Sequence, residues 1–210
     1  SGWMDTAAFL RASRAYFENI NSWRRGVVAE DSLDTSGEGL VWQGETFSHA
    51  VFCTGWEAAR HPWFQWIPFQ SAQGTVLSVE ADTGGERRII NRGCWLLPRA
   101  DGSLRAGPTY DLKFTDPQTP SGEMVDGLQT KLKALLKVPY RVTGNQTGVR
   151  PIIKGHQALF GRHPARPQIA MLNGLGSKGV LRAPWVSRQL ASHLLEGSSI
   201  EPGLDLAGNL

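Results

Sequence analysis

The chain has 210 residues, a formal net charge of +3 and a pI near 9.1. Its basic residues are scattered, so the charge gives no sign of nucleic-acid binding. The sequence has no run of about 18 apolar residues and no signal peptide, which argues against a membrane span and favours a cytoplasmic protein. The two cysteines, Cys53 and Cys94, stand in apolar, strand-like stretches and are expected to be reduced core thiols. The spacing of Cys, His and carboxylate residues indicates no metal site, and no motif indicates a Ser or Cys nucleophile.

The first predicted element is a helix from Asp5, a possible cap, to about Asn19. Residues 26–33 and 38–55 follow as short strands. The second of these stretches carries a hairpin signal at 42–45 and ends in a buried run. A loop rich in aromatic residues and proline separates it from the rest of the chain.

Four strand-like pieces come next and suggest an antiparallel meander, with turn signals between them. They are residues 75–81, 87–93, 94–100 and 104–110. The remaining predicted elements are a helix over 121–138, an extended stretch over 140–153, a strand over 168–173 and a helix from about 177 to 196. The predicted fold class is therefore α+β.

A Gly-rich loop follows the last predicted strand and has the literal spacing G-x-G-x-x-G, at Gly174, Gly176 and Gly179. A dinucleotide fingerprint also needs a second parallel strand and an acidic residue on it. Only one helix and a tail follow Gly179, and Glu196 stands at the end of that helix, so the fingerprint is rejected. The loop still suits a flat or electron-rich ligand, because glycines let the backbone come close and a helix start favours negative charge. A plain turn packed on protein remains an alternative.

Several stretches, in order along the chain, resemble FAD-dependent oxidoreductases of the D-amino-acid oxidase and glycine oxidase type. They are "SGWMDTAAFL" at 1–10, "AVFCTGW" at 50–56, "SAQGTVLSVEA" at 71–81, "CWLLPRADGSLRAGPTYD" at 94–111 and "TGVRPIIKGHQALFGRHP" at 147–164, which leads into the glycine loop. The resemblance implies FAD as cofactor and an α+β flavoprotein architecture with an antiparallel substrate sheet. By this resemblance, residues 1–56 and 148–197 belong to the FAD-binding domain, 57–147 form the substrate-binding domain, and 198–210 are a tail.

One part of the family pattern is missing from the sequence. Members of this family begin with a strand, a G-x-G-x-x-G and a helix that hold the FAD pyrophosphate. The resemblance therefore implies an N-terminal FAD-binding segment that is cut off or lies on another chain, and the fragment alone is expected to be inactive.

The resemblance assigns the substrate carboxylate to Arg150, whose guanidinium fork suits bidentate binding. The alternative is a structural arginine that caps strand carbonyls or pairs with an acidic neighbour. It places Tyr110 in the substrate pocket, where the ring would orient an amine or carboxylate or simply pack. It places Thr54 and Gly55 beside the ribityl or adenosine part of FAD, with a plain strand-end turn as the alternative.

The loop from Gly174 to Val180 is expected to run along the flavin ring, through Gly174, Leu175, Gly176, Ser177, Lys178, Gly179 and Val180. Its backbone amides and Lys178 would stabilise negative charge there, although Lys178 could equally be a solvated surface lysine. His156 and His163 are candidates for an acid–base role, with a loop position as the alternative for His163.

The aromatic loop contains Trp63, Phe64, Trp66 and Phe69. Packing is the favoured reading, ahead of a substrate entrance, burial against another domain or contact with a membrane surface. The resemblance as a whole implies oxidation of a small amine or amino acid by hydride transfer to flavin. A 2-hydroxy-acid oxidoreductase on the same scaffold and a non-catalytic flavoprotein-like binding module remain alternatives.

Overall fold

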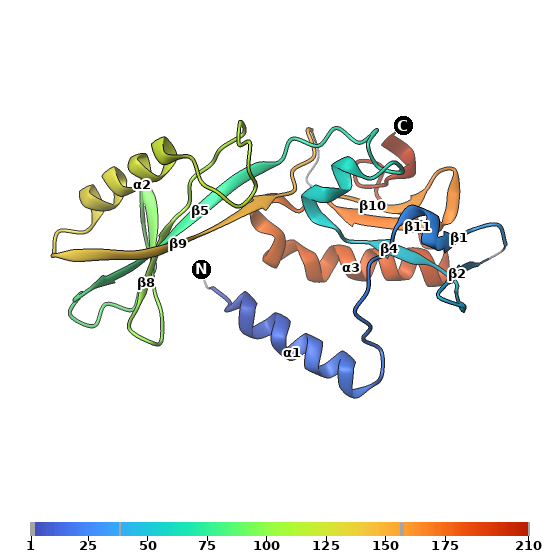
Figure 1. The fold of residues 1–210 in the computed structure, drawn as a ribbon, viewed down its shortest axis with the longest axis horizontal. Coiled ribbons are helices and arrows are strands. Elements are labelled where there is room, and N and C mark those ends of the chain that lie inside the picture. Colours follow the sequence, from blue (N-terminus) through green and yellow to red (C-terminus); the bar gives the residue numbers. More distant parts are fainter. Residues whose placement is uncertain (1–2, 38, 156–157, 210) are drawn as a thin grey trace. The chain divides into compact units, whose positions relative to one another are not determined.

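The computed structural model describes residues 3–37, 39–155 and 158–209. It divides into two compact units. Unit 1 comprises residues 1–52, 160–172 and 178–210, and unit 2 comprises 53–159 and 173–177. Helices and sheets are mixed along the chain, which confirms the predicted α+β class (Figure 1). No helix in the described part is long and apolar enough to cross a membrane.

Unit 2 is built on one five-stranded antiparallel sheet (Figure 1). Its strand order is β6-β7-β8-β5-β9. The bounds are β5 Ala72–Ala81, β6 Ile90–Arg92, β7 Cys94–Pro98, β8 Leu104–Gly107 and β9 Tyr140–Arg150. The predicted meander is therefore correct for β6 to β8, whereas β5 lies between β8 and β9 and pairs with both.

A single helix, α2 (Gly122–Leu135), covers one face of this sheet. Leu128 and Leu132 project from it into a core formed with sheet residues, among them Leu77, Leu96 and Leu104. The apolar residues of β5 and β7 alternate with more exposed ones along much of each strand, as expected for strands with one face on a core. The hydrophobic core of unit 2 is therefore formed between α2 and the sheet of the same unit.

Tight turns in unit 2 follow the predicted signals. The Asp82 carboxylate accepts a hydrogen bond from the backbone N–H of Gly84 at 2.9 Å. The Asp101 carboxylate accepts one from the N–H of Ser103, also at 2.9 Å. Each aspartate folds its side chain onto the backbone two residues ahead, which is why this residue type favours turns.

Unit 1 contains a three-stranded sheet in the order β10-β11-β4. These strands are β4 Ala50–Phe52, β10 Leu159–His163 and β11 Arg166–Asn173. β4 and β11 are parallel, and Ile169, Ala170 and Met171 of β11 are completely buried. A continuous apolar run of this kind is typical of a parallel strand covered on both faces. The long helix α3 (Gly179–Glu196) follows β11 and ends at Gly197, which adopts the left-handed conformation.

A second, smaller sheet of unit 1 contains β1 (Leu33–Asp34), β2 (Leu40–Trp42) and β3 (Glu45–Phe47). The predicted hairpin at 42–45 is confirmed, with Gln43 and Gly44 both at positive φ, as a two-residue turn requires. The predicted strand over 26–33 is wrong, because only its last residue belongs to a strand.

Helix α1 (Thr6–Asn19) also belongs to unit 1 and begins where the sequence predicts. The Asp5 carboxylate caps it by accepting a hydrogen bond from the N–H of Ala8 at 3.0 Å. None of the α1 residues, all of which are described, is buried. The two cysteines differ in environment: Cys94 is buried as predicted, whereas Cys53 is exposed.

Candidate functional site

Arg150, the predicted carboxylate-binding residue, is the last residue of β9 and is partly buried. Its guanidinium lies across the neighbouring strand at Gly74. Nη2 donates to the carbonyl of Thr109 at 3.3 Å, and Nη1 lies 3.5 Å from the carbonyl of Gln73. The guanidinium carbon also lies 5.7 Å from the centre of the Tyr110 ring. The predicted pair Arg150 and Tyr110 is therefore adjacent within unit 2.

Arg150 is a cation without an ion-pair partner among the described residues. No carboxylate in the described part of the chain forms an ion pair with it, and the groups around it there are two neutral carbonyls and one aromatic ring. Burial lowers the pKa of the guanidinium, an effect that Tyr110 partly offsets. Because desolvation of a charge is costly, a carboxylate ligand would relieve this cost.

The segment that carries Tyr110 is held to β5 by its two neighbours. Thr109 donates its backbone N–H to the Thr75 carbonyl at 3.0 Å, and its hydroxyl accepts from the N–H of Thr75 at 2.8 Å. Asp111 exchanges two backbone hydrogen bonds with Gln73, at 2.8 and 2.9 Å. Thr109 and Asp111 are buried while Tyr110 between them is 52% exposed. This alternation fixes the backbone of Tyr110 and directs its side chain away from the core.

The first part of the glycine loop lies in unit 2, beside the segment that follows Arg150. The N–H of Gly176 donates to the carbonyl of Pro151 at 3.1 Å. Gly174 has a φ of 77°, and a Cβ there would collide with Ile153. The structure thus brings the loop and the Arg150 strand end side by side, and glycine at 174 is needed both for the backbone angle and for the close approach.

Asn173, directly before the glycine loop, is a buried polar residue that was not predicted from the sequence. Its amide nitrogen donates to the carbonyl of Gly55 at 2.8 Å, and its amide oxygen accepts from the N–H of Gly174 at 2.8 Å. It therefore ties the predicted residue Gly55 to the start of the glycine loop. Thr54, by contrast, is exposed and caps the following short helix without a side-chain hydrogen bond. An Asn directly before Gly at a strand end was the available signal.

The second part of the loop begins helix α3 in unit 1. Lys178 is the N-cap residue and makes no side-chain capping hydrogen bond, and the first turn contains no acidic residue. Ser177, Lys178 and Val180 are exposed, and Leu175 is partly exposed. A helix start with neither a side-chain cap nor a carboxylate leaves its N–H dipoles available to an anionic or electron-rich group.

These residues fit a flavin in two separate respects. Gly176 has a φ of 58°, and the one neighbour near a Cβ at this position would be Ile152 at 3.9 Å, so the backbone presents an open surface without a side chain. A flat ring system can approach such a surface closely. The uncapped start of α3 suits the electron-rich pyrimidine side of a flavin ring.

Among the remaining predicted candidates, Phe69 of the aromatic loop forms an antiparallel bridge with Ile153, the residue that lies against Gly174. His163 is buried, and its Nδ1 accepts from the N–H of Ala165 at 3.1 Å, while His156 lies outside the described residues. Trp63 and Phe64 are buried, and the Trp66 indole donates to the carbonyl of Trp63 at 2.8 Å. Packing, the favoured interpretation of the aromatic loop, agrees with this burial. The described residues include no metal-binding group of three His, Cys or carboxylate residues.

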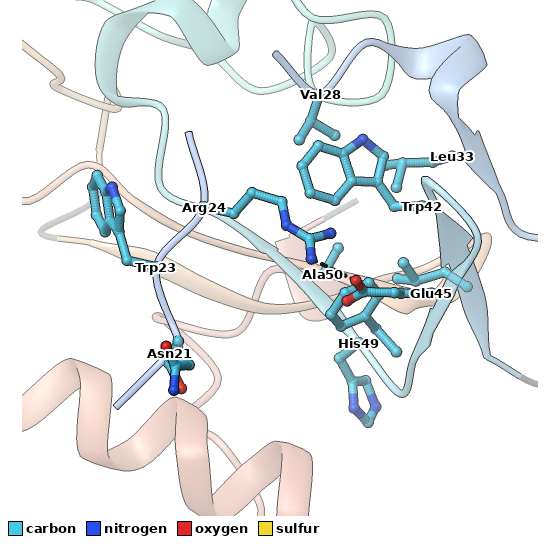
Figure 2. Close-up of a pocket in the computed structure, with 12 residues that line it drawn as sticks. Asn21, Trp23, Arg24, Val28, Leu33, Trp42, Glu45, His49 and Ala50 are labelled. Atoms are coloured by element: carbon cyan, nitrogen blue, oxygen red, sulfur yellow. Dashed lines mark hydrogen bonds and ion pairs between the residues drawn. The ribbon is translucent and has the colours of Figure 1, made fainter. Parts of the chain in front are cut away.

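A pocket in unit 1 was not foreseen (Figure 2). It has a volume of about 490 Å³ and lies between the segment after α1 and strands β2 to β4. Figure 2 shows Arg24 reaching toward Glu45, with which it forms an ion pair at 2.5 Å. The Arg24 guanidinium also lies 5.8 Å from the centre of the Trp42 ring. The pocket combines an aromatic wall with a charge pair that is already satisfied, so it offers no unpaired charge to a ligand.

Comparison with known proteins identifies the family. A family model described as "FAD dependent oxidoreductase" matches residues 1–193. The chain belongs to this family. The match confirms the resemblance drawn from the ordered motifs, and it identifies FAD as the cofactor on which the family depends.

Solved structures with the same fold are more distant in sequence. Glycine oxidase from Geobacillus kaustophilus is 22% identical, with a TM-score of 0.64 over 80% of this chain and 48% of that one. Iminodiacetate oxidase from Chelativorans sp. is 18% identical, with a TM-score of 0.68 over 91% of this chain and 55% of that one. L-proline dehydrogenase from P. horikoshii is 16% identical, with a TM-score of 0.62 over 83% and 50%. The chain therefore spans about half the length of the solved structures it matches.

Proposed function

We propose that the protein containing this chain is an FAD-dependent oxidoreductase that oxidises a small amine or amino acid, with Arg150 binding the substrate carboxylate. The observation that carries the proposal is the partly buried Arg150 guanidinium, which is held by neutral carbonyls and has no carboxylate partner among the described residues. A guanidinium fork binds a carboxylate through two parallel hydrogen bonds, so it both holds and orients such a substrate.

The similar structures support an amine substrate. Their names refer to glycine, iminodiacetate and L-proline. All three compounds carry an amine and a carboxylate close together. A 2-hydroxy acid would present the same carboxylate to Arg150, so the residue by itself favours acidic substrates without selecting the amine.

Each group of residues would have its own role in the reaction. When bound, FAD supplies the acceptor for a hydride from the substrate carbon. Arg150 would bind the carboxylate of the substrate. The Tyr110 ring, beside the guanidinium, would restrict rotation of the bound substrate. The amides at the start of α3 would favour negative charge on the group held there. The loop glycines would allow that group to approach the backbone.

The test replaces Arg150 in the flavin-loaded protein. Arg150→Leu should lower kcat/KM for glycine, D-alanine, L-proline and iminodiacetate by about 10²-fold or more, because a charge-assisted pair is lost in a partly desolvated place. Arg141→Leu is the matched control, since Arg141 lies on the same strand but is exposed and paired with Glu80. The panel includes glycolate and lactate, which separate the amine from the hydroxy-acid reaction.

Two results would contradict the proposal. Equal kcat/KM values for Arg150→Leu and Arg141→Leu would remove Arg150 from the substrate site. A protein that binds no FAD, and has no absorbance near about 450 nm, would exclude the flavin chemistry itself.

A further inference from the structure

Gly74, on the central strand β5, stands out because its backbone does not explain the absence of a side chain. Its φ lies outside the left-handed region that favours glycine. It is a regular member of the ladder and pairs with Gly148 of β9. Glycine in a strand interior destabilises the strand relative to residues with side chains. A local reason other than backbone conformation must therefore favour glycine here.

The reason lies in the space above Gly74. A Cβ built on this residue would come closer than 3.0 Å to the guanidinium carbon and both terminal nitrogens of Arg150, and real Cβ atoms essentially never approach other atoms so closely. These are the three nearest atoms to the Cβ. The guanidinium thus occupies the place that any other side chain at position 74 would take.

We propose that Gly74 is the positioning residue for Arg150: the missing side chain forms the slot in which the guanidinium lies flat against β5. The proposal rests on the proposed function, in which this guanidinium binds the substrate carboxylate. The slot directs the guanidinium to the carbonyls of Thr109 and Gln73 and holds it beside the Tyr110 ring. A guanidinium fixed in this way loses little conformational entropy when it binds a ligand.

An alanine at position 74 is expected to displace Arg150 without changing the fold. The atoms it would strike are the far end of a flexible side chain, so Arg150 can move away without a change in the sheet. The hydrogen bonds to Thr109 and Gln73 would be lost in that movement, and the guanidinium would sample several rotamers. The expected result is a folded protein with a misplaced Arg150.

Gly148 is a matched control in the same pair. It faces Gly74 across the two strands, and a Cβ built on it meets no atom within 4 Å. Gly74→Ala and Gly148→Ala therefore make the same chemical change at the two positions of one cross-strand pair. They differ in whether the new methyl group displaces Arg150.

The experiment uses the flavin-loaded protein and measures binding of benzoate, with benzamide as an uncharged probe of similar shape. Gly74→Ala should weaken benzoate binding by about tenfold or more and leave benzamide binding unchanged, because the charge-assisted contact is the part that is lost. Gly148→Ala should leave both unchanged. In steady-state kinetics with glycine or L-proline, Gly74→Ala should raise KM more than it lowers kcat.

Two double variants test that Gly74 acts through Arg150. Adding Gly74→Ala to Arg150→Leu should cause no further loss of benzoate affinity, because the group it displaces is already absent. If Gly74→Ala proves less stable than Gly148→Ala, then Gly74→Ala combined with Arg150→Ala should restore the melting temperature, because the slot is then empty. Failure of either expectation would overturn the proposal.

The two proposals fail in different ways. Unchanged benzoate binding in Arg150→Leu would refute the carboxylate site itself. A large loss in Arg150→Leu together with equal affinities for Gly74→Ala and Gly148→Ala would leave the carboxylate site in place and refute the role of Gly74.

Discussion

Helices α1 and α2 have the same length, 14 residues, and both have apolar side chains at helical spacing, but they reach different environments. In unit 2, α2 places Leu128 and Leu132 in the core of the sheet. In unit 1, α1 leaves Phe9 and Leu10 more than half exposed and buries none of its residues.

The difference shows where the stability of a short helix comes from. Helices of this length are marginal in water by themselves, and packing of the apolar face supplies most of their stability in proteins. The α2 helix has that packing within its own unit, whereas the start of α1 is determined locally by the Asp5 cap. Large apolar side chains exposed together, as on α1, are typical of surfaces that contact other polypeptide segments.

The largest expected effect comes from truncating matched leucines in the two helices. Leu132 is completely buried, so Leu132→Ala should lower the free energy of unfolding by about 2–5 kcal/mol through lost burial and an added cavity. Leu10 is 64% exposed, so Leu10→Ala should change it by less than about 0.5 kcal/mol. Urea unfolding of both variants measures the contrast. A loss of several kcal/mol in Leu10→Ala would mean that α1 packs on a core in solution.

A smaller effect is expected from the helix caps. Asp5→Ala removes a real capping hydrogen bond and should weaken the first turn of α1 by about 1 kcal/mol. Ser121→Ala should be nearly neutral, because Ser121 caps α2 without a side-chain hydrogen bond. Amide hydrogen exchange should be faster over residues 8–12 in Asp5→Ala, with little change in the global unfolding midpoint. Equal exchange rates in the wild type and Asp5→Ala would show that the cap contributes nothing in solution.

Elements with a local signal could be predicted from the sequence. The Asp5 cap located the start of α1, apolar spacing located α2 and α3, and the Gln43–Gly44 turn located a hairpin. The predicted strand over 26–33 failed because apolar, β-branched residues such as Val27 and Val28 form a strand only where another strand pairs with them. The position of β5 between β8 and β9 is likewise a long-range pairing that no local pattern specifies.

The candidate site likewise contains residues that the sequence predicts and a feature that depends on long-range pairing. Arg150 and the glycine loop were found because each stands in a sequence motif that resembles the family pattern. The slot at Gly74 depends on the register that pairs Ala72 with Arg150 and Gly74 with Gly148, and no local sequence pattern specifies that register.

The smallest expected effect concerns a polar contact in unit 1, whereas the α2 core of unit 2 is apolar. Arg162 on β10 contacts the Nε2 of His49 and donates to the carbonyls of Pro167 at 3.0 Å and Leu194 at 3.0 Å. Burial, with smaller contributions from Arg162 and His193, lowers the pKa of His49 below its ordinary value of 6.5. The imidazole must be neutral to accept a hydrogen bond from the guanidinium.

The sign of the pH dependence follows from the direction of this pKa shift. The folded state binds a proton at His49 less readily than the unfolded state, so stability is full above pH 6.5 and falls as the pH drops below it. The loss should be about 0.5 kcal/mol or less between about pH 8 and about pH 5, because the ring is only partly buried and solvent screens its interactions. His49→Gln keeps an acceptor for Arg162 without a titrating group, so urea midpoints at these two pH values should differ less than in the wild type. An unchanged pH dependence in His49→Gln would assign the acid sensitivity to other groups and leave the Arg162 contact without a role in it.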